Sequence, residues 1–291
     1  MLSFVVLNKD DPSFDYISQK ISKTIKIVSY STRLKDTSVY SQNYREGDSG
    51  SVFEVIEGVN SYTLESNLLG EYNVSNILAA IACCREYGVD YVSIKNALQS
   101  FKAPKGRLEK IENNKGFEIY IDFAHTSNSL EQVLSLLKKR IDLRGKKGKL
   151  ITIFGCAGER DELKRPIMGE ISATIADISI FTAEDPRSEK VENIIEEIVK
   201  GAKKSGAKDL KVKHYSDAVH ANRHYYLEIP ERGEAISFAL QKIARKGDTI
   251  LICGKGHEKS MAYNGVAYAW SDEEAVKLAL KGDVKEITRS N

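Results

Sequence analysis

The sequence contains few of the residues that build disulfide frameworks or break regular structure. It has four cysteines, five prolines and one tryptophan among 291 residues. Cys83 and Cys84 are adjacent, Cys156 and Cys253 lie in or beside apolar runs, and no two cysteines form a C-x-x-C pair. We therefore expect buried free thiols rather than a disulfide-stabilised fold, which fits a reducing compartment.

Long apolar segments and an excess of one charge are also lacking. No run approaches the roughly 20 apolar residues that a membrane-spanning helix needs, and residues 1–8 lack the basic start of a secretory signal. The 43 basic and 41 acidic residues give a formal net charge of +2, which provides no long-range attraction to nucleic acid or to an anionic membrane. We expect a cytoplasmic protein with neither as partner, whose function depends on local charge.

The pattern of the chain changes at a Pro- and Gly-containing segment, residues 103–106. Before it, short strands are predicted at 4–7, 24–29, 52–59 and 62–64, helices at 12–21, 73–87 and 92–101, and a polar loop or edge region at 31–50. After it, strands and helices alternate. We therefore expect a partial α/β domain over residues 1–104, followed by a Rossmann-like domain with a mostly parallel sheet over residues 105–291.

Charged or glycine-containing loops follow four predicted strands of the second domain. They are residues 122–126 after the strand at 117–123, residues 155–161 after 150–154, residues 182–187 after 178–181, and residues 254–258 after 249–253. Taken singly, each loop could be a tight turn or a helix start. Ligands of parallel sheets bind beyond the carboxyl ends of the strands, so the occurrence of all four at one edge favours a binding site.

These loops carry the groups that a zwitterionic amino acid requires. Guanidinium groups form paired hydrogen bonds with carboxylates, carboxylates accept hydrogen bonds from an ammonium group, and glycine allows the backbone to approach a ligand closely. The candidate amino-acid-binding residues are Arg160, Glu184, Asp185, Arg187, Gly254 and Glu258.

The motifs resemble those of the Mur ligases, especially the MurE type, which adds the third residue of the peptidoglycan stem to a UDP-N-acetylmuramoyl dipeptide. The resemblance rests on Gly-Lys-Gly-His-Glu at 254–258, Asp-x-Ala-His-Thr at 122–126, Gly-x-x-Gly-x-Arg-Asp-x-x-Lys-Arg-Pro at 155–166 and Asp-Pro-Arg at 185–187. It extends to Asn-x-Asp-Asp-Pro at 8–12, the Asn-containing segment 70–82 and Gly-Arg-x-Glu at 106–109. It therefore covers nearly the whole chain.

The resemblance implies ATP-dependent amide formation, in which an acyl phosphate is attacked by the amine of an amino acid. The substrates would be ATP, UDP-N-acetylmuramoyl-L-alanyl-D-glutamate and a diamino acid, with Mg²⁺ and ATP as cofactors of the complete enzyme. The resemblance also implies nucleotide-binding residues, namely Asn73, Asn76, Arg107, Asp122, His125 and Lys164.

Two positions depart from the family pattern. Enzymes of the family that add diaminopimelate usually read Asp-Asn-Pro-Arg where this chain has Glu184-Asp185-Pro186-Arg187. Arg187 remains available for a second carboxylate, as in diaminopimelate, whereas the added negative charge leaves lysine or ornithine as alternatives. Ser127 replaces a usual proline, with a minor expected effect.

The phosphate-binding loop G-x-x-x-x-G-K-[ST] does not occur in these 291 residues. Such a loop cradles phosphates with its backbone N–H groups and a lysine, and phosphoryl transfer depends on positioned phosphates and metal. The resemblance then implies that the UDP-binding domain and the Mg²⁺-binding residues are also missing. We expect the isolated chain to be inactive as a ligase, with a partner chain as one possible source of the ATPase half.

Several alternative functions remain open at this stage. The chain could be a non-catalytic amino-acid-binding subunit, or a related ligase of the folylpolyglutamate or cyanophycin synthetase type. His214, His220 and His224 lie close in sequence, but without an adjoining Cys or carboxylate they favour a solvated cluster over a metal site, and no metal is expected. A dinucleotide-binding enzyme is disfavoured because no G-x-G-x-x-G follows a strand.

Overall fold

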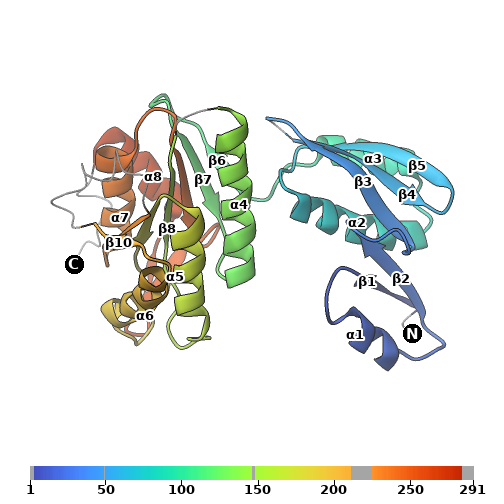
Figure 1. The fold of residues 1–291 in the computed structure, drawn as a ribbon, viewed down its shortest axis with the longest axis horizontal. Helices are drawn as coiled ribbons and strands as arrows, with labels where there is room; N and C mark the ends of the chain where they lie inside the picture. The colour runs from blue at the N-terminus through green and yellow to red at the C-terminus, as the bar shows by residue number, and fades with distance from the viewer. Residues whose placement is uncertain (1–2, 49, 146–147, 211–223, 284–291) are drawn as a thin grey trace. The chain divides into compact units, whose positions relative to one another are not determined.

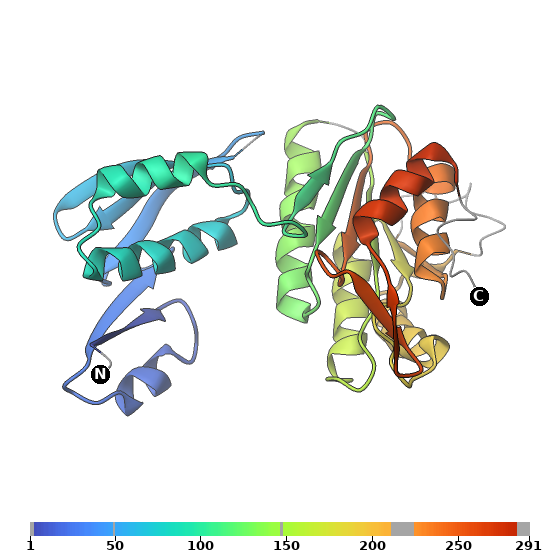
Figure 2. The same ribbon diagram turned by 180° about the vertical axis from the view of Figure 1, so that it is seen from behind.

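The computed structural model describes residues 3–48, 50–145, 148–210 and 224–283, and the chain forms two compact units, residues 1–103 and 104–291 (Figures 1 and 2). Among the described residues, no helix has both the length and the apolar character that crossing a membrane requires. The predicted α/β class is confirmed in both units, which are described here one at a time.

The first unit is a five-stranded sheet covered by two helices. Its strands lie in chain order: β1 (Phe4–Asn8), β2 (Lys26–Ser31), β3 (Val39–Glu46), β4 (Ser51–Glu57) and β5 (Asn60–Ser66). The pairs β1–β2 and β2–β3 are parallel, and β3–β4 and β4–β5 are antiparallel. Helix α1 (Phe14–Lys20) connects β1 to β2, and α2 (Glu71–Glu86) and α3 (Tyr91–Ser100) follow β5. Buried residues of α2, including Val74, Leu78 and Ile81, pack with Phe53 and Val55 of β4 to form the core.

The predicted polar loop over residues 31–50 is wrong in part, because β3 occupies its centre and pairs with strands on both sides. Only Val39 is a buried apolar residue within this strand, so the sequence lacks the alternation of apolar side chains that marks a strand. Backbone pairing with β2 and β4 supplies the stabilisation instead. The ladder is irregular between Gln42 and Arg45, near Asn43, whose φ of 54° is left-handed.

The second unit has a seven-stranded sheet in the order β10-β11-β9-β8-β12-β7-β6. The strands are β6 (Glu109–Ile111), β7 (Glu118–Asp122), β8 (Leu150–Phe154), β9 (Ile178–Phe181), β10 (Lys208–Asp209), β11 (Tyr225–Glu228) and β12 (Thr249–Cys253). All neighbouring pairs are parallel except β6–β7. A hairpin of β13 (Ser260–Tyr263) and β14 (Val266–Ala269) follows β12.

Helices cover both faces of this sheet (Figures 1 and 2). Helices α4 (Ser127–Leu143), α5 (Lys164–Ile175) and α6 (Val191–Lys204) pack against side chains such as Leu150 and Phe154. On the opposite face, α7 (Arg232–Phe238), the π-helix η2 (Ala239–Ile243) and α8 (Asp272–Lys281) pack against side chains such as Ile151 and Ile153. Because successive strand residues point to opposite faces, a strand as apolar as β8 is buried on both sides.

The sequence did not predict β6, β11 or the β13–β14 hairpin. These strands have only three or four residues each, which is too short for a periodic pattern to emerge. The sequence also predicts a strand at 210–214, which does not overlap β10 at 208–209. Leu210 follows that strand, and residues 211–214 lie outside the described residues. His214 and His220 also lie outside them. His224 is described, and its Nδ1 is 2.6 Å from the carbonyl oxygen of Ala176.

Candidate functional site

The four charged loops follow four neighbouring strands, in the order β9, β8, β12 and β7. These strands are parallel, so all four loops emerge at the same edge of the sheet. Backbone and side-chain contacts join the loop after β9 to the loops after β8 and β12, and the loop after β12 to the loop after β7. The edge therefore carries one continuous surface made from segments that are far apart in the sequence.

Lys255 links the loop after β12 to the loop after β9. Its side chain is 1% exposed, and its Nζ lies 2.9 Å from Asp185 Oδ2 and 2.5 Å from Glu258 Oε2. The second oxygen of Asp185 accepts a 2.8 Å hydrogen bond from the backbone N–H of Ala262. One buried ammonium thus holds two of the predicted ligand carboxylates, and Asp185 is fixed in orientation at both oxygens.

Glu184 lies beneath this surface and is 7% exposed. Among the described residues its Oε2 atom has no hydrogen-bond partner. Burial raises the pKa of Glu184 to about 7, although the cations of Lys164, Arg232 and Lys255 act in the opposite direction. The carboxyl group lies against Gly254, where an added Cβ would come within 2.9 Å of Oε2. Gly254 also has a φ of 107°, which disfavours any other residue.

The loop after β8 is joined to the loop after β9 by its backbone. The N–H of Gly158 donates to the carbonyl oxygen of Asp185 at 2.8 Å, and the N–H of Glu159 donates to Glu189 Oε1 at 2.5 Å. Arg165, which is 1% exposed, holds Glu189 through hydrogen bonds of 2.9 and 3.0 Å. This network fixes the N–H of Glu159, the residue directly before the exposed Arg160.

Left-handed backbone occurs next to both candidate arginines. Glu159, directly before Arg160, and Arg187 itself each have a φ of 54°. Such conformations are uncommon for residues with a side chain and cluster at functional sites. Arg187 is held by its N–H, which donates to the carbonyl oxygen of Ala262 at 3.0 Å. The fold therefore maintains unusual turns where the two guanidinium groups leave the backbone.

The loop after β7 packs against the loop after β12 and the segment 106–108. The two oxygens of Asp122 accept hydrogen bonds from the N–H groups of Leu108 and Ala124, at 2.7 and 2.8 Å. Burial raises the pKa of Asp122, while these two hydrogen bonds lower it. The guanidinium of Arg107 lies 4.8 Å from the ring centre of Phe123. Asp122 therefore also has a structural function, because it anchors the segment that carries Arg107.

His125 and Lys164 are neighbours at the same edge. Lys164 Nζ donates to the carbonyl oxygen of His125 at 2.7 Å, and the His125 Nδ1 lies 3.0 Å from the carbonyl oxygen of Phe123. The rings of His125 and His257 both contact Phe123, with centre distances of 4.7 and 5.3 Å. Together with Arg107 they form a cluster of cationic and aromatic groups on the second unit.

Asn73 and Asn76, the remaining nucleotide candidates, lie on the first turns of α2 in the first unit. Asn76 Nδ2 donates to Asn73 Oδ1 at 3.2 Å, and Asn73 Nδ2 donates to the carbonyl oxygen of Leu69 at 2.8 Å. The predicted nucleotide residues are thus divided between the two units. Arg107, Asp122, His125 and Lys164 lie on the second.

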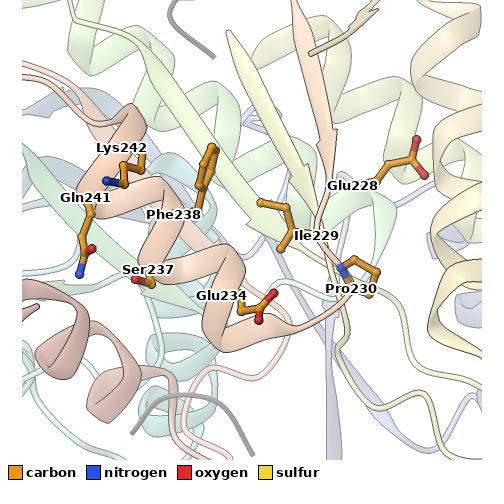
Figure 3. A pocket seen from close by; sticks show the side chains of 8 residues that line it. All are labelled: Glu228, Ile229, Pro230, Glu234, Ser237, Phe238, Gln241 and Lys242. Carbon is orange, nitrogen blue, oxygen red and sulfur yellow. The ribbon is translucent and has the colours of Figure 1, made fainter. Parts of the chain in front are cut away.

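A separate cavity of about 470 Å³ opens beside α7 (Figure 3). It is lined by side chains such as Ile229, Phe238 and Lys242. None of the candidate residues lines it, so it does not belong to the four-loop edge. Within the described part of the chain, no group of three or more His, Cys, Asp or Glu side chains is arranged to hold a metal ion.

Sequence reasoning did not assign a role to Lys255, Arg165 or the buried pair Arg232–Asp272. Lys255 stands inside the quoted Gly-Lys-Gly-His-Glu motif, so its position between two glycines was the available signal. Arg232 and Asp272 are separated by 40 positions, and their 2.7 Å ion pair becomes visible only in the folded chain.

We expect Lys255→Met to destabilise the second unit by about 2 kcal/mol. The variant removes the ammonium group but keeps most of the side-chain volume, so the carboxylates of Asp185 and Glu258 lose a charged hydrogen-bond donor. Both carboxylates are partly exposed, which keeps the expected loss below that of a fully buried pair. Chemical denaturation, monitored by the fluorescence of Trp270, would measure this loss of stability. Adding Asp185→Asn should recover part of the loss, and no recovery would argue against this charge pairing.

Sequence and structure comparisons extend over both units. Residues 2–84 match the family described as Mur ligase middle domain, and residues 106–256 match Mur ligase, glutamate ligase domain. The UDP-N-acetylmuramoyl-L-alanyl-D-glutamate–2,6-diaminopimelate ligase of Syntrophomonas wolfei subsp. wolfei is 35% identical over 284 residues, which are 97% of this chain and 53% of that protein. The chain spans about half the length of the curated relatives it matches.

Solved structures show the same fold. The structure of a UDP-N-acetylmuramoyl-L-alanyl-D-glutamate–2,6-diaminopimelate ligase matches with a TM-score of 0.55 and 29% identity, over 96% of this chain and 53% of that one. The MurF ligase of Thermotoga maritima in complex with ADP matches with a TM-score of 0.59 at 17% identity, over 97% and 54%. The match to the glutamate ligase domain covers more than half of the residues of this chain. The chain therefore belongs to the Mur ligase family.

Proposed function

We propose that this chain provides the amino-acid-accepting part of an ATP-dependent ligase that extends the peptide of UDP-N-acetylmuramoyl-L-alanyl-D-glutamate by a diamino acid. The observation that carries the proposal is the contact between the loops after β8, β9 and β12, centred on Asp185 and the buried Lys255. The relatives that are about one third identical carry the same activity in their names.

The loops offer both charge signs that an amino acid presents. Arg160 and Arg187 would bind carboxylate groups through their planar guanidinium forks. Glu258 and Glu184 would accept hydrogen bonds from ammonium groups, and the backbone at Gly254 would approach the ligand closely. Holding the amino acid by its opposite charges would orient its reacting amine, which is the main contribution that this unit can make to amide formation.

A diamino acid with a second carboxylate fits the charges better than a simple diamine. Asp185 has a negative charge that an asparagine would lack, but the Lys255 ammonium pairs with it at 2.9 Å. The additional charge at this position is therefore balanced within the protein. Arg187, on the same loop, is partly exposed and would bind a distal carboxylate, so a diaminopimelate-like substrate is preferred over lysine.

ATP in the complete enzyme would supply the phosphoryl group that activates the acceptor carboxylate. Asn73 and Asn76 on the first unit, and Arg107, Asp122, His125 and Lys164 on the second, are the residues that we propose to contact the nucleotide. The guanidinium of Arg107 above the Phe123 ring fits a flat or anionic partner. These 291 residues contain no phosphate-binding loop, so we propose that the main contacts to the triphosphate lie outside them. The segment that carries this loop, in the same protein or in a partner chain, would also bind Mg²⁺.

A non-catalytic amino-acid-binding subunit is the second candidate, favoured by the same lack of a phosphate loop. Ligases of the folylpolyglutamate type share the fold, as shown by the Mycobacterium tuberculosis enzyme at a TM-score of 0.64 and 15% identity. The Asp-Pro-Arg and Gly-Lys-Gly-His-Glu motifs favour the peptidoglycan ligase.

We expect the isolated 291-residue chain to bind the amino acid but to form no amide product. The physical reason is that binding depends on the four-loop edge, whereas phosphoryl transfer needs the missing phosphate loop. Calorimetric titration with meso-diaminopimelate, lysine and ornithine would measure binding, and phosphate release with ATP and the UDP-muramoyl dipeptide would measure turnover. Arg187→Ala should abolish binding of diaminopimelate, with Lys242→Ala, beside the separate cavity, as the control. Turnover by the isolated chain would contradict the expected inactivity, and no binding of any of the three amino acids would contradict the proposed function.

A further inference from the structure

A buried guanidinium lies directly behind the amino-acid-binding loops. Arg232 is the first residue of α7 and is 0% exposed, as is Asp272 at the start of α8. Two hydrogen bonds of 2.7 Å join them, from Arg232 Nε and Nη2 to the two oxygens of Asp272. The indole N–H of Trp270 donates to Asp272 Oδ1 at 2.9 Å. The carboxylate is therefore fixed by two side chains, and the guanidinium is fixed by the carboxylate.

The remaining donors of Arg232 reach the ends of two strands. Its Nη1 donates to the carbonyl oxygen of Ala183 at 3.1 Å, and its Nη2 donates to the carbonyl oxygen of Cys253 at 2.8 Å. The residues that follow these carbonyls are Glu184 and Gly254, which contact each other in the candidate site. One side chain thus ties together the two peptides from which the loops after β9 and β12 begin.

These strands are not neighbours in the sheet, because β8 lies between β9 and β12. Ladder hydrogen bonds therefore do not connect them directly. At the carboxyl edge they are joined by Lys255, which pairs with Asp185, and by the contacts of Arg232. Strand ladders end at Phe181 and Cys253, whereas the contacts of Arg232 extend to Ala183. The guanidinium spans β8 just where the loops leave the sheet.

We infer that Arg232, oriented by Asp272 and Trp270, is a positioning residue that sets the loops after β9 and β12 in register for amino-acid binding. The part of the inference that concerns binding rests on the proposed function. The structural part does not rest on the proposed function, since it concerns only how firmly Arg232 holds the two loops when no ligand is bound. Lysine cannot replace Arg232 in this arrangement, because a single ammonium group lacks the planar fork that serves one carboxylate and two carbonyls together.

Hydrogen exchange of the complete chain would test the structural part. In Arg232→Lys, backbone amides of residues 183–185, 187 and 254–258 should exchange at least about tenfold faster, as expected when a local opening becomes easier. Amides of α4 and α5 should keep their protection. Asp248→Asn is the matched control, because Asp248 is 6% exposed and accepts hydrogen bonds from the N–H groups of Lys149 and Arg245 at the opposite end of the sheet. Asp248→Asn should speed exchange only at that opposite end of the sheet and leave the two loops unchanged.

Unchanged exchange of the two loops in Arg232→Lys would overturn the inference, as would an equal effect of Asp248→Asn on them. If Arg232→Lys fails to fold, Trp270→Phe provides the milder variant, because it removes only the donor to Asp272 and keeps an aromatic ring. Faster exchange confined to the two loops would then support the inference, and unchanged exchange would overturn it.

Calorimetric titration with meso-diaminopimelate separates this inference from the proposed function. The parent chain should bind, and Arg232→Lys should bind at least about tenfold more weakly, because small displacements of a binding group have large effects. If the parent chain binds no amino acid, the proposed function fails, while hydrogen exchange still decides the positioning role. Equal affinity of the parent chain and Arg232→Lys would overturn the inference and leave the proposed function intact.

Discussion

Glu184→Gln should make the second unit more stable than the parent chain at pH 8 and above, by about 3 kcal/mol. Glu184 is buried and has a pKa raised to about 7, from an ordinary value of 4.5. Each pKa unit corresponds to about 1.4 kcal/mol of differential interaction. The pKa of Glu184 is raised this far because burial removes the carboxylate from water, and because Oε2 has no hydrogen-bond partner among the described residues.

The sign of the effect follows from proton linkage. Between pH 4.5 and 7 the folded chain keeps the proton of Glu184, whereas the unfolded chain has lost it. The free energy of unfolding therefore falls as the pH rises through this window, and it levels off above the folded-state pKa. Glutamine is neutral at every pH, so Glu184→Gln should lack this decline.

Denaturant unfolding at pH 5, 6, 7 and 8 would measure the free energy of unfolding of both chains. Trp270 is the one tryptophan of the sequence, so its fluorescence reports on the second unit. Glu192→Gln, at an exposed position of α6, provides the control and should retain the slope of the parent chain. Identical pH slopes for the parent chain and Glu184→Gln would show that Glu184 does not hold its proton in the folded state.

Gly254→Ala is expected to destabilise the second unit by about 3 kcal/mol and to abolish amino-acid binding. Two effects combine at this position. A φ of 107° is strained for alanine, and the new Cβ would lie 2.9 Å from Glu184 Oε2 and 3.0 Å from its Cγ and Cδ. The buried Glu184 would have to move, and it would disturb the loop that carries Asp185 and Arg187.

Gly206→Ala separates the two effects. Gly206 has a φ of 81° in the same unit, but an added Cβ there would meet nothing within 4 Å. It should therefore cost only the backbone strain, about 1 kcal/mol. The double variant Gly254→Ala with Glu184→Ala should recover the part of the loss that comes from the contact. Thermal or chemical unfolding would measure the stability of all three variants. Equal losses for Gly254→Ala and Gly206→Ala would exclude the contact with Glu184 as a cause of the destabilisation.

Most of the second unit follows from its sequence because its strands are apolar on both faces and are bounded by helices with clear periodicity. Strand β8 and the β9 and β12 strands are buried along their whole length, which marks them as central strands of a parallel sheet. Parallel strands place their carboxyl ends at one edge, so the common location of the four loops could be predicted from the sequence. The polar β3 and the short β11 could not, because pairing with neighbours rather than their own side chains makes them strands.

The sequence by itself determined which loops carry guanidinium, carboxylate and glycine residues, because each motif stands where an apolar strand ends. Only the tertiary structure decided which of these groups meet. The insertion of β12 between β7 and β8 brings Gly254 onto Glu184 and Lys255 onto Asp185, although 70 positions separate the members of each pair. Strand order and the burial of Arg232 against Asp272 depend on packing among distant segments, which no local sequence pattern encodes.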